Sequence, residues 1–82
     1  MIASYSYIRD MVYGGQGRNY SHCIIACDQF SFEYYPIYVE QCEDPQALID
    51  RTNQLNMQKV MEVYNYSKDL DEQLCQVRCW EV

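Results

Sequence analysis

The sequence predicts a small α+β domain in which an antiparallel sheet of about four strands packs against one main helix. Three features lead to this prediction: a helix start at Asp44-Pro45, runs of β-branched and aromatic residues on either side of Asp28 and Gln29, and an alternating pattern near the C-terminus. Of the 82 residues, 49% are hydrophobic and 15% are aromatic, which is enough for a packed core. We therefore expect a single domain over residues 1–82.

The main helix is expected from about Pro45 to Leu55. Asp44 can accept hydrogen bonds from the unpaired N–H groups of the first turn. Pro45 suits the first helical position, because the N–H that it lacks would have no partner there. The residues that follow at helical spacing and form the inward stripe are Leu48, Ile49, Thr52 and Leu55.

Three strands are expected around this helix. Residues 20–27 and 30–39 are rich in β-branched and aromatic residues and predict a hairpin across the turn at Asp28 and Gln29. Pro36 must then lie on an edge or at a bulge, because it cannot donate to a neighbouring strand. Residues 59–66 predict the third strand.

The N-terminal segment leaves two alternatives open. A short helix capped by Ser4 or Ser6 would place Tyr5, Ile8 and Val12 on one face and end at Gly14. An initial strand is the alternative.

The C-terminal segment is also ambiguous. Small and apolar residues alternate with polar or large ones over residues 74–82, which favours a fourth strand with Cys75, Val77 and Cys79 on one face. The alternative is a helix that begins at a Ser67 cap and carries Leu70, Leu74 and Val77 on one face.

The cysteines offer a possible metal site, which their spacing disfavours. Residues four apart on a strand lie ~13 Å from each other along the chain, so neither pair with this spacing can chelate locally. We expect a metal-free protein with reduced thiols that pack as small hydrophobic groups, Cys42 being the one most exposed. The five cysteines are Cys23, Cys27, Cys42, Cys75 and Cys79.

No catalytic or cofactor motif is present. His22 is the single histidine, and on a strand it points away from its neighbour Cys23, which removes the obvious dyad. The loop at residues 14–18 is rich in glycine but lacks the Lys-Ser/Thr of a phosphate-binding loop. We expect no catalytic residue, no bound cofactor and no enzymatic activity.

The charge distribution is the strongest functional signal. The net charge is −6, which is opposite to the basic surface that a nucleic-acid-binding protein needs. No lysine or arginine occurs between Arg18 and Arg51, although six carboxylates lie there: Asp28, Glu33, Glu40, Glu43, Asp44 and Asp50. Such a region attracts cationic partners. The chain shows no signal-peptide or membrane-span pattern, so a cytoplasmic location is expected.

These observations predict a partner-binding surface of carboxylates and tyrosines. Tyrosine adds large contact area and a hydroxyl at low entropic cost, and Tyr34 and Tyr35 should point to opposite faces of one strand. The predicted partner-binding residues are Glu33, Tyr34, Tyr35, Tyr38, Glu40, Glu43, Asp44 and Asp50.

The function expected first is a small acidic protein that docks on a basic, nucleic-acid-binding surface of another protein and blocks it. In size, acidity and lack of a catalytic motif the chain resembles the phage-encoded inhibitors of host defence, such as anti-CRISPR and anti-restriction proteins. Those inhibitors share little sequence or fold, so the resemblance transfers no residue roles. The alternatives are an assembly module that forms a homodimer through a sheet edge and, third, a small thiol or zinc protein.

Overall fold

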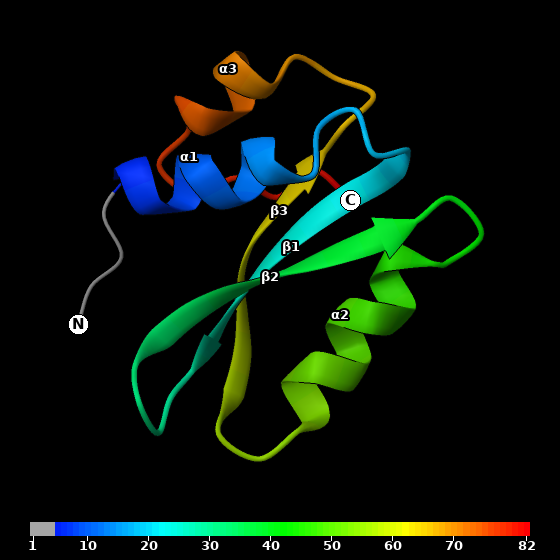
Figure 1. Cartoon of the computed structure of the whole chain (residues 1–82). Helices are drawn as coiled ribbons and strands as arrows, with labels where there is room; N and C mark the ends of the chain where they lie inside the picture. Colours follow the sequence, from blue (N-terminus) through cyan, green and yellow to red (C-terminus); the bar gives the residue numbers. More distant parts are fainter. Residues whose placement is uncertain (1–4) are drawn as a thin grey trace.

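The computed structural model describes residues 5–82, which form a three-stranded antiparallel sheet with helices on both faces (Figure 1). The α+β class is confirmed. In chain order the elements are α1 (Tyr5–Gly14), β1 (Tyr20–Asp28), β2 (Glu33–Glu40), α2 (Pro45–Gln54), β3 (Gln58–Asn65) and α3 (Leu70–Leu74).

The first strand occupies the centre of the sheet. The strand order is β2-β1-β3, and both neighbours are antiparallel to β1. Ile24 pairs with Ile37 on one side and with Val63 on the other. The predicted hairpin is present, and Pro36 lies on the edge strand β2, where its missing N–H is tolerated.

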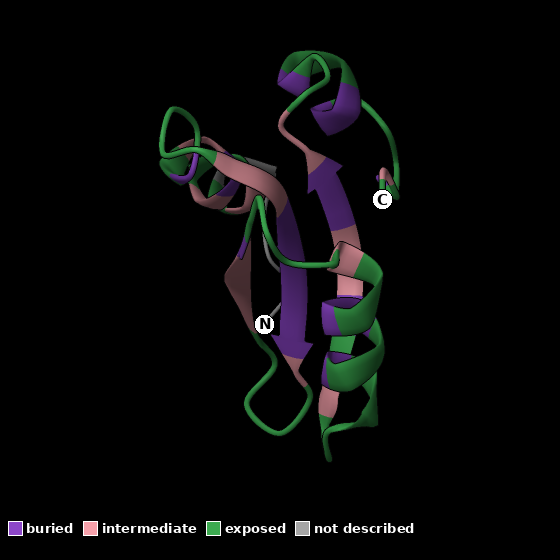
Figure 2. Cartoon of the chain, turned by 90° about the vertical axis from the view of Figure 1, so that its right-hand side faces the viewer, coloured by how far each residue is buried: buried purple, intermediate pink, exposed green. Residues whose placement is uncertain are grey.

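The helices form a layer on each side of the sheet. α1 and α3 cover one face and α2 covers the other (Figure 1), so β1 is covered from both sides and is coloured as buried along most of its length in Figure 2. Five consecutive residues of β1, Cys23 to Cys27, are buried. A strand covered on both faces carries a continuous apolar run in place of alternation, and the sequence Cys-Ile-Ile-Ala-Cys fits this rule.

Helix α2 forms as predicted. Asp44 is its N-cap and accepts a hydrogen bond of 3.0 Å from the Gln46 backbone N–H. Leu48, Ile49 and Thr52 are buried. The expectation that Leu55 points inward is wrong, because Leu55 follows the last turn with extended backbone angles and is 55% exposed.

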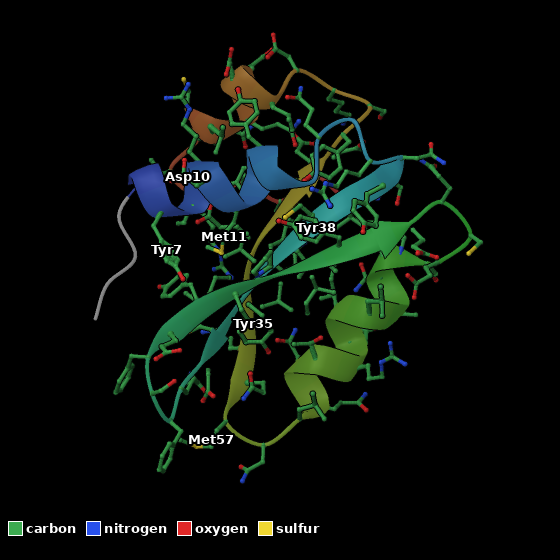
Figure 3. All side chains as sticks on the ribbon, in the orientation of Figure 1. Tyr7, Asp10, Met11, Tyr35, Tyr38 and Met57 are labelled. Carbon is green, nitrogen blue, oxygen red and sulfur yellow. The ribbon has the colours of Figure 1, made fainter. Side chains whose placement is uncertain are left out.

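The N-terminal segment is a helix, and the alternative strand is wrong. Ser6 lies within α1, so it is not the cap, and Ser4 lies outside the described residues. Val12 is fully buried, as its place on the inward face predicts. The Tyr38 hydroxyl donates to the Met11 carbonyl at 2.7 Å and so ties the end of α1 to β2 (Figure 3).

The predicted fourth strand is wrong, and the described sheet has three strands. Residues 75–82, which were expected to belong to it, are irregular apart from one bridge, and the short helix before them, α3, has Asp69 as its N-cap in place of the predicted Ser67. The Gln73 amide then fixes this helix to the end of β3, because it accepts from the Asn65 N–H at 2.7 Å and donates to the Asn65 carbonyl at 2.8 Å. Helix α3 ends at Leu74, so it does not extend to Val77 as the helical alternative expected.

Beyond α3, the chain runs beside the outer edge of β3, where the Glu81 N–H donates to the Val63 carbonyl at 3.0 Å and the Arg78 Nε–H donates to the Met61 carbonyl at 3.0 Å. Val63 and Trp80 form an isolated parallel bridge, in which the Val63 N–H donates to the Cys79 carbonyl at 3.0 Å. Cys79 is buried, as the alternation predicted, but Val77 is fully exposed.

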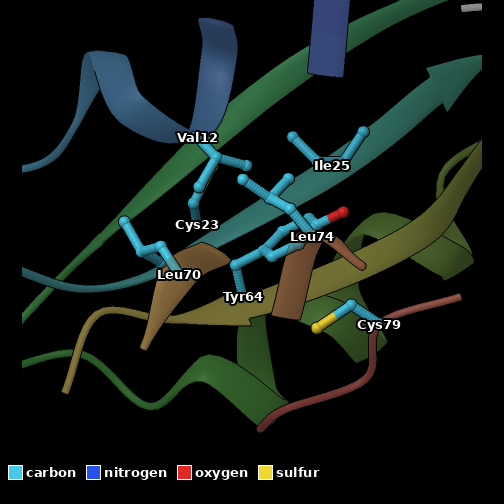
Figure 4. Close-up of a cluster of buried hydrophobic side chains, with 7 residues drawn as sticks. All are labelled: Val12, Cys23, Ile25, Tyr64, Leu70, Leu74 and Cys79. Carbon is cyan, nitrogen blue, oxygen red and sulfur yellow. The ribbon is translucent and has the colours of Figure 1, made fainter. Parts of the chain in front are cut away.

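Two buried clusters lie on opposite faces of the sheet. The cluster under α1 and α3, shown in Figure 4, consists of Val12, Cys23, Ile25, Tyr64, Leu70, Leu74 and Cys79. The cluster under α2 consists of Ile24, Val39, Leu48, Ile49, Val60 and Val63. Neighbouring residues of β1 thus belong to different clusters, which makes the register of this strand strongly specified. No helix within residues 5–82 is long and apolar enough to cross a membrane.

The loop after α1 passes close to two tyrosine side chains at Gly15. A Cβ atom on Gly15 would lie 2.5 Å from the Tyr66 hydroxyl and 2.6 Å from the Tyr38 ring. The Tyr66 hydroxyl is fixed, because it donates to the Val12 carbonyl at 2.5 Å. This position therefore has no room for a side chain.

We predict that Gly15→Ala destabilises the fold by about 1–3 kcal/mol, the usual cost of overpacking a filled site. The urea midpoint should fall while the slope of the transition is unchanged. Gln16→Ala is the matched control, because Gln16 is exposed in the same loop and should leave the midpoint within error. Equal midpoints for the two variants would contradict the close approach at Gly15.

Candidate functional site

The predicted partner-binding carboxylates lie at two ends of the molecule. Glu33 is the first residue of β2 and Glu40 is the last. A strand rises about 3.3 Å per residue, so these two positions are about 23 Å apart. Glu33 therefore belongs to a different surface from the other four.

Three carboxylates gather where β2 leads into α2, and a fourth, Asp50, lies about 9 Å further along the axis of α2. We call this surface the acidic end and define it by Glu40, Glu43, Asp44 and Asp50, which are all exposed. The Glu43 carboxylate accepts a hydrogen bond of 3.2 Å from the Glu40 N–H, and the Asp44 carboxylate caps α2. The Gln46 side chain donates to Asp50 at 3.0 Å. These contacts hold three of the four carboxylates in defined positions while leaving them open to solvent.

Two arginines lie beside the acidic end. Arg18 and Glu40 line one shallow cavity of about 330 Å³, and Arg51 lines another of about 320 Å³ together with Glu43 and Asp44. Neither arginine forms an ion pair in the described part of the chain, where the single ion pair joins Lys68 and Glu81 at 3.0 Å. Four carboxylates against two arginines leave this surface negative.

The predicted tyrosines mainly stabilise the fold. Tyr34 and Tyr38 pack against the cluster under α1, and burial raises the pKa of Tyr38. Tyr35 lies on the opposite face, as predicted, and donates to the Gln58 side chain at 2.5 Å. All three are half-buried. None of them borders the cavities of the acidic end.

Sequence reasoning missed the aromatic residue that does border the acidic end. Tyr20 lines the cavity that holds Arg18 and Glu40, and its ring stacks on Tyr38 with 5.1 Å between the centroids. Its position depends on the pairing of Tyr20 with Glu40 across the sheet. The sequence could have indicated this position of Tyr20 only through the hairpin register, counted back from the turn at Asp28.

A second group of carboxylates lies on α3 and was also missed as a surface. Asp69, Asp71 and Glu72 are exposed. Asp69 accepts from the backbone N–H of Asp71 at 2.9 Å, and Asp71 accepts from the Tyr13 hydroxyl. The helix dipole favours acidic residues in a first helical turn, so these carboxylates help to stabilise α3.

The cysteines are dispersed over the structure. Cys23, Cys27 and Cys79 are buried, whereas Cys42 and Cys75 are exposed. Burial raises the pKa of Cys23 to about 12 and that of Cys79 to about 11, the latter helped by the nearby Glu81 carboxylate. Within residues 5–82, no group of three or more potential ligands is arranged to hold a metal ion.

His22 contacts the serine that precedes it on β1. Ser21 Oγ lies 2.9 Å from His22 Nδ1 and also donates to the Val39 carbonyl at 3.3 Å. Burial lowers the pKa of His22, and its Nε2 atom is buried without a partner among the described residues. Both side chains line a polar cavity of about 330 Å³.

No family model, curated protein or solved structure matches this chain. The fold and the surface chemistry therefore carry the functional inference. Among the surfaces described above, the acidic end combines the most exposed charge with fixed geometry.

We predict that two thiols, those of Cys42 and Cys75, react rapidly with an aromatic disulfide reagent at pH 8. A thiol whose pKa is near 12 is ionised to only about one part in 10⁴ at this pH, and burial also excludes the reagent. The other three thiols should react only after unfolding in urea. The fast phase should disappear in the variant with Cys42→Ser and Cys75→Ser. A fast phase that remained in this variant would contradict the burial of Cys23, Cys27 and Cys79.

Proposed function

We propose that this protein is a small acidic binding protein that docks on a basic, nucleic-acid-binding surface of another protein and blocks it. The observation that carries the proposal is the acidic end, where four exposed carboxylates lie at the start of α2, three of them are held by hydrogen bonds, and none forms an ion pair with a described residue. The proposal assigns no catalytic step to the protein.

The carboxylates of the acidic end stand in for phosphates. Asp44 and Asp50 are six residues apart on α2, which places them about 9 Å apart along the helix axis. Lysine and arginine side chains that neutralise phosphates can neutralise these groups in the same way. The charges speed association and fix orientation, as complementary rim charges do in protein complexes.

Tyr20 supplies apolar contact area next to these charges. It is half-buried, lines the cavity beside Glu40, and is braced by its stack on Tyr38. A braced aromatic side chain loses little freedom on binding, which suits an anchor in a desolvated contact. We place the binding surface on Tyr20 and the acidic end, with Tyr34, Tyr35 and Tyr38 supporting the fold.

A homodimer through the edge of β2 is the second candidate. β2 has β1 on one side only, so its outer edge is open to a further strand. Two features weaken it as a template: Pro36 lacks a donor in the middle of the strand, and the Tyr7 hydroxyl donates to the Tyr34 carbonyl at 3.3 Å.

The acidic end can be tested with a variant that removes charge and keeps hydrogen bonds. The changes Glu40→Gln, Glu43→Gln, Asp44→Asn and Asp50→Asn retain every acceptor, including the helix cap that would cost about 1 kcal/mol if lost. Immobilised wild-type protein should capture nucleic-acid-binding proteins from a lysate at low salt. Duplex DNA should release them, and the variant should bind them at least tenfold more weakly.

Glu33→Gln is the matched control, because Glu33 lies at the far end of β2 and should leave capture unchanged. Binding to the wild type should also weaken as salt rises, since the Debye length falls below ~8 to 10 Å. If the fourfold variant captured the same proteins with the same affinity and salt dependence, the proposed docking mode would be wrong.

A further inference from the structure

The end of the molecule opposite the acidic end exposes large apolar side chains from two turns. We call this surface the apolar tip and define it by Phe30, Phe32, Leu55 and Met57, which are 83%, 58%, 55% and 43% exposed. The Gln29 N–H donates to the Met57 carbonyl at 2.7 Å, so the β1–β2 turn and the α2–β3 turn are joined directly. Figure 3 shows Met57 at the end of the molecule away from α1.

The apolar tip is large for a chain of this size. A phenylalanine side chain has roughly 200 Å² of surface, so the four exposed side chains together present on the order of 400–500 Å². The largest apolar patch on a typical monomer is about 300–600 Å² and is often functional. On an 82-residue chain such a patch indicates a surface that another molecule covers.

Backbone strain occurs at the same place. Phe32 and Met57 have φ values of 58° and 63°, in the left-handed region that bulky residues rarely adopt. Elsewhere the described chain uses glycine or asparagine for such positions, at Gly17 and Asn19. Strained residues of this kind cluster at binding sites. A turn needed only for chain reversal would gain stability from glycine at either position.

The charges around the apolar tip are of both signs. Asp28 pairs with Glu33 on one side of β1, and Cys27 pairs with Lys59 on the other. Glu33 and Lys59 are both exposed, and they lie on opposite edge strands. A twofold axis through the apolar tip can bring Glu33 of each copy to Lys59 of the other, which is the self-complementarity that a symmetric dimer needs.

The carboxylates at the junction of β2 and α2 do not oppose such a pairing. Glu40 lies about 23 Å from Glu33 along β2, well beyond the Debye length of ~8 Å at physiological salt, whereas Asp50 is nearer, about 7.5 Å from Leu55 along the helix axis. Two copies joined at their apolar tips would hold their acidic ends at the far poles. This arrangement buries the apolar surface without bringing the charged surfaces together.

We propose that the apolar tip is a homodimer interface in which Phe30, Phe32, Leu55 and Met57 of two copies pack together, with Glu33 and Lys59 paired across it. This inference is independent of the proposed docking function, because dimerisation and binding of a basic partner are measured in separate experiments. It also differs from pairing through the β2 edge, because the turns make the contact and no ladder is extended.

Sedimentation velocity of the full chain over a range of concentrations tests the proposal. The mass should rise from 9.8 kDa towards twice that value. Phe30→Ser should remain monomeric, whereas Val77→Ser, the matched control at a fully exposed apolar residue outside the apolar tip, should dimerise like the wild type. A wild-type protein that stays monomeric at about 1 mM, where even weak complexes form, would overturn the proposal. A dimer that survives Phe30→Ser would overturn it too and would favour the β2 edge.

Charge reversal gives a second test, because its expected result would not occur if Glu33 and Lys59 only stabilised the monomer. Glu33→Lys alone and Lys59→Glu alone should each weaken dimerisation about tenfold, because every interfacial pair becomes repulsive. Mixing the two single variants should restore the dimer mass, since both interfacial pairs of the heterodimer again join one lysine to one glutamate. Failure of the mixture to associate would overturn the assigned pairing.

Substitution at the strained positions separates binding from folding. Phe32→Gly and Met57→Gly should weaken dimerisation at least tenfold, while the urea midpoint of the dilute monomer stays equal or rises, because the left-handed backbone is relieved. A lower midpoint for both would show that these side chains stabilise the fold and would overturn their assignment to an interface.

Lipid binding is the alternative use of the apolar tip, and phosphatidylcholine vesicles test for it. If the protein stays monomeric and sediments with these vesicles, the apolar tip binds lipid and the dimer proposal is wrong.

Discussion

The burial of β1 on both faces and both edges is the constraint on which the rest of this structure depends. Its residues alternate between two separate clusters, and its backbone pairs with β2 on one side and β3 on the other. A shift of one residue would exchange every side chain between the clusters. The side chains of β1 on each face determine where the helices pack. The loops then form the surfaces at the two ends of the sheet.

Because the strands run antiparallel, the loops sort into two ends with different chemistry. The loop from β2 to α2 carries carboxylates that stay exposed and form no ion pair with a described residue, whereas the two turns at the opposite end carry apolar side chains. An 82-residue chain has little core to spare, so strain and exposed apolar area at one end are significant costs. The two proposals assign a separate contact to each end, one electrostatic and one apolar.

Local signals in the sequence predicted the local structure well. The Asp44-Pro45 cap indicated α2, and the apolar runs around Asp28 indicated the hairpin, because each depends on contacts between near neighbours. The prediction of a fourth strand was wrong because pairing with β3 depends on tertiary contacts, and residues 75–82 form only one isolated bridge with that strand. The candidate surface was only partly predictable, since Glu33 and Glu40 are close in sequence but lie at opposite ends of one strand. The left-handed angles at Phe32 and Met57 could not be anticipated, because neither residue type favours them.

The single bridge between Trp80 and β3 has a practical consequence for spectroscopy. Trp80 is the only tryptophan, is 43% exposed, and lies 5.4 Å from the Arg78 guanidinium, so its emission reports on the C-terminal segment, which joins the buried cluster under α1 and α3 through Cys79. Such a segment can open at lower free energy than the central strand of a sheet. The emission of Trp80 therefore follows release of this segment from Val63, while the far-ultraviolet signal follows loss of the sheet, and the two transitions need not coincide.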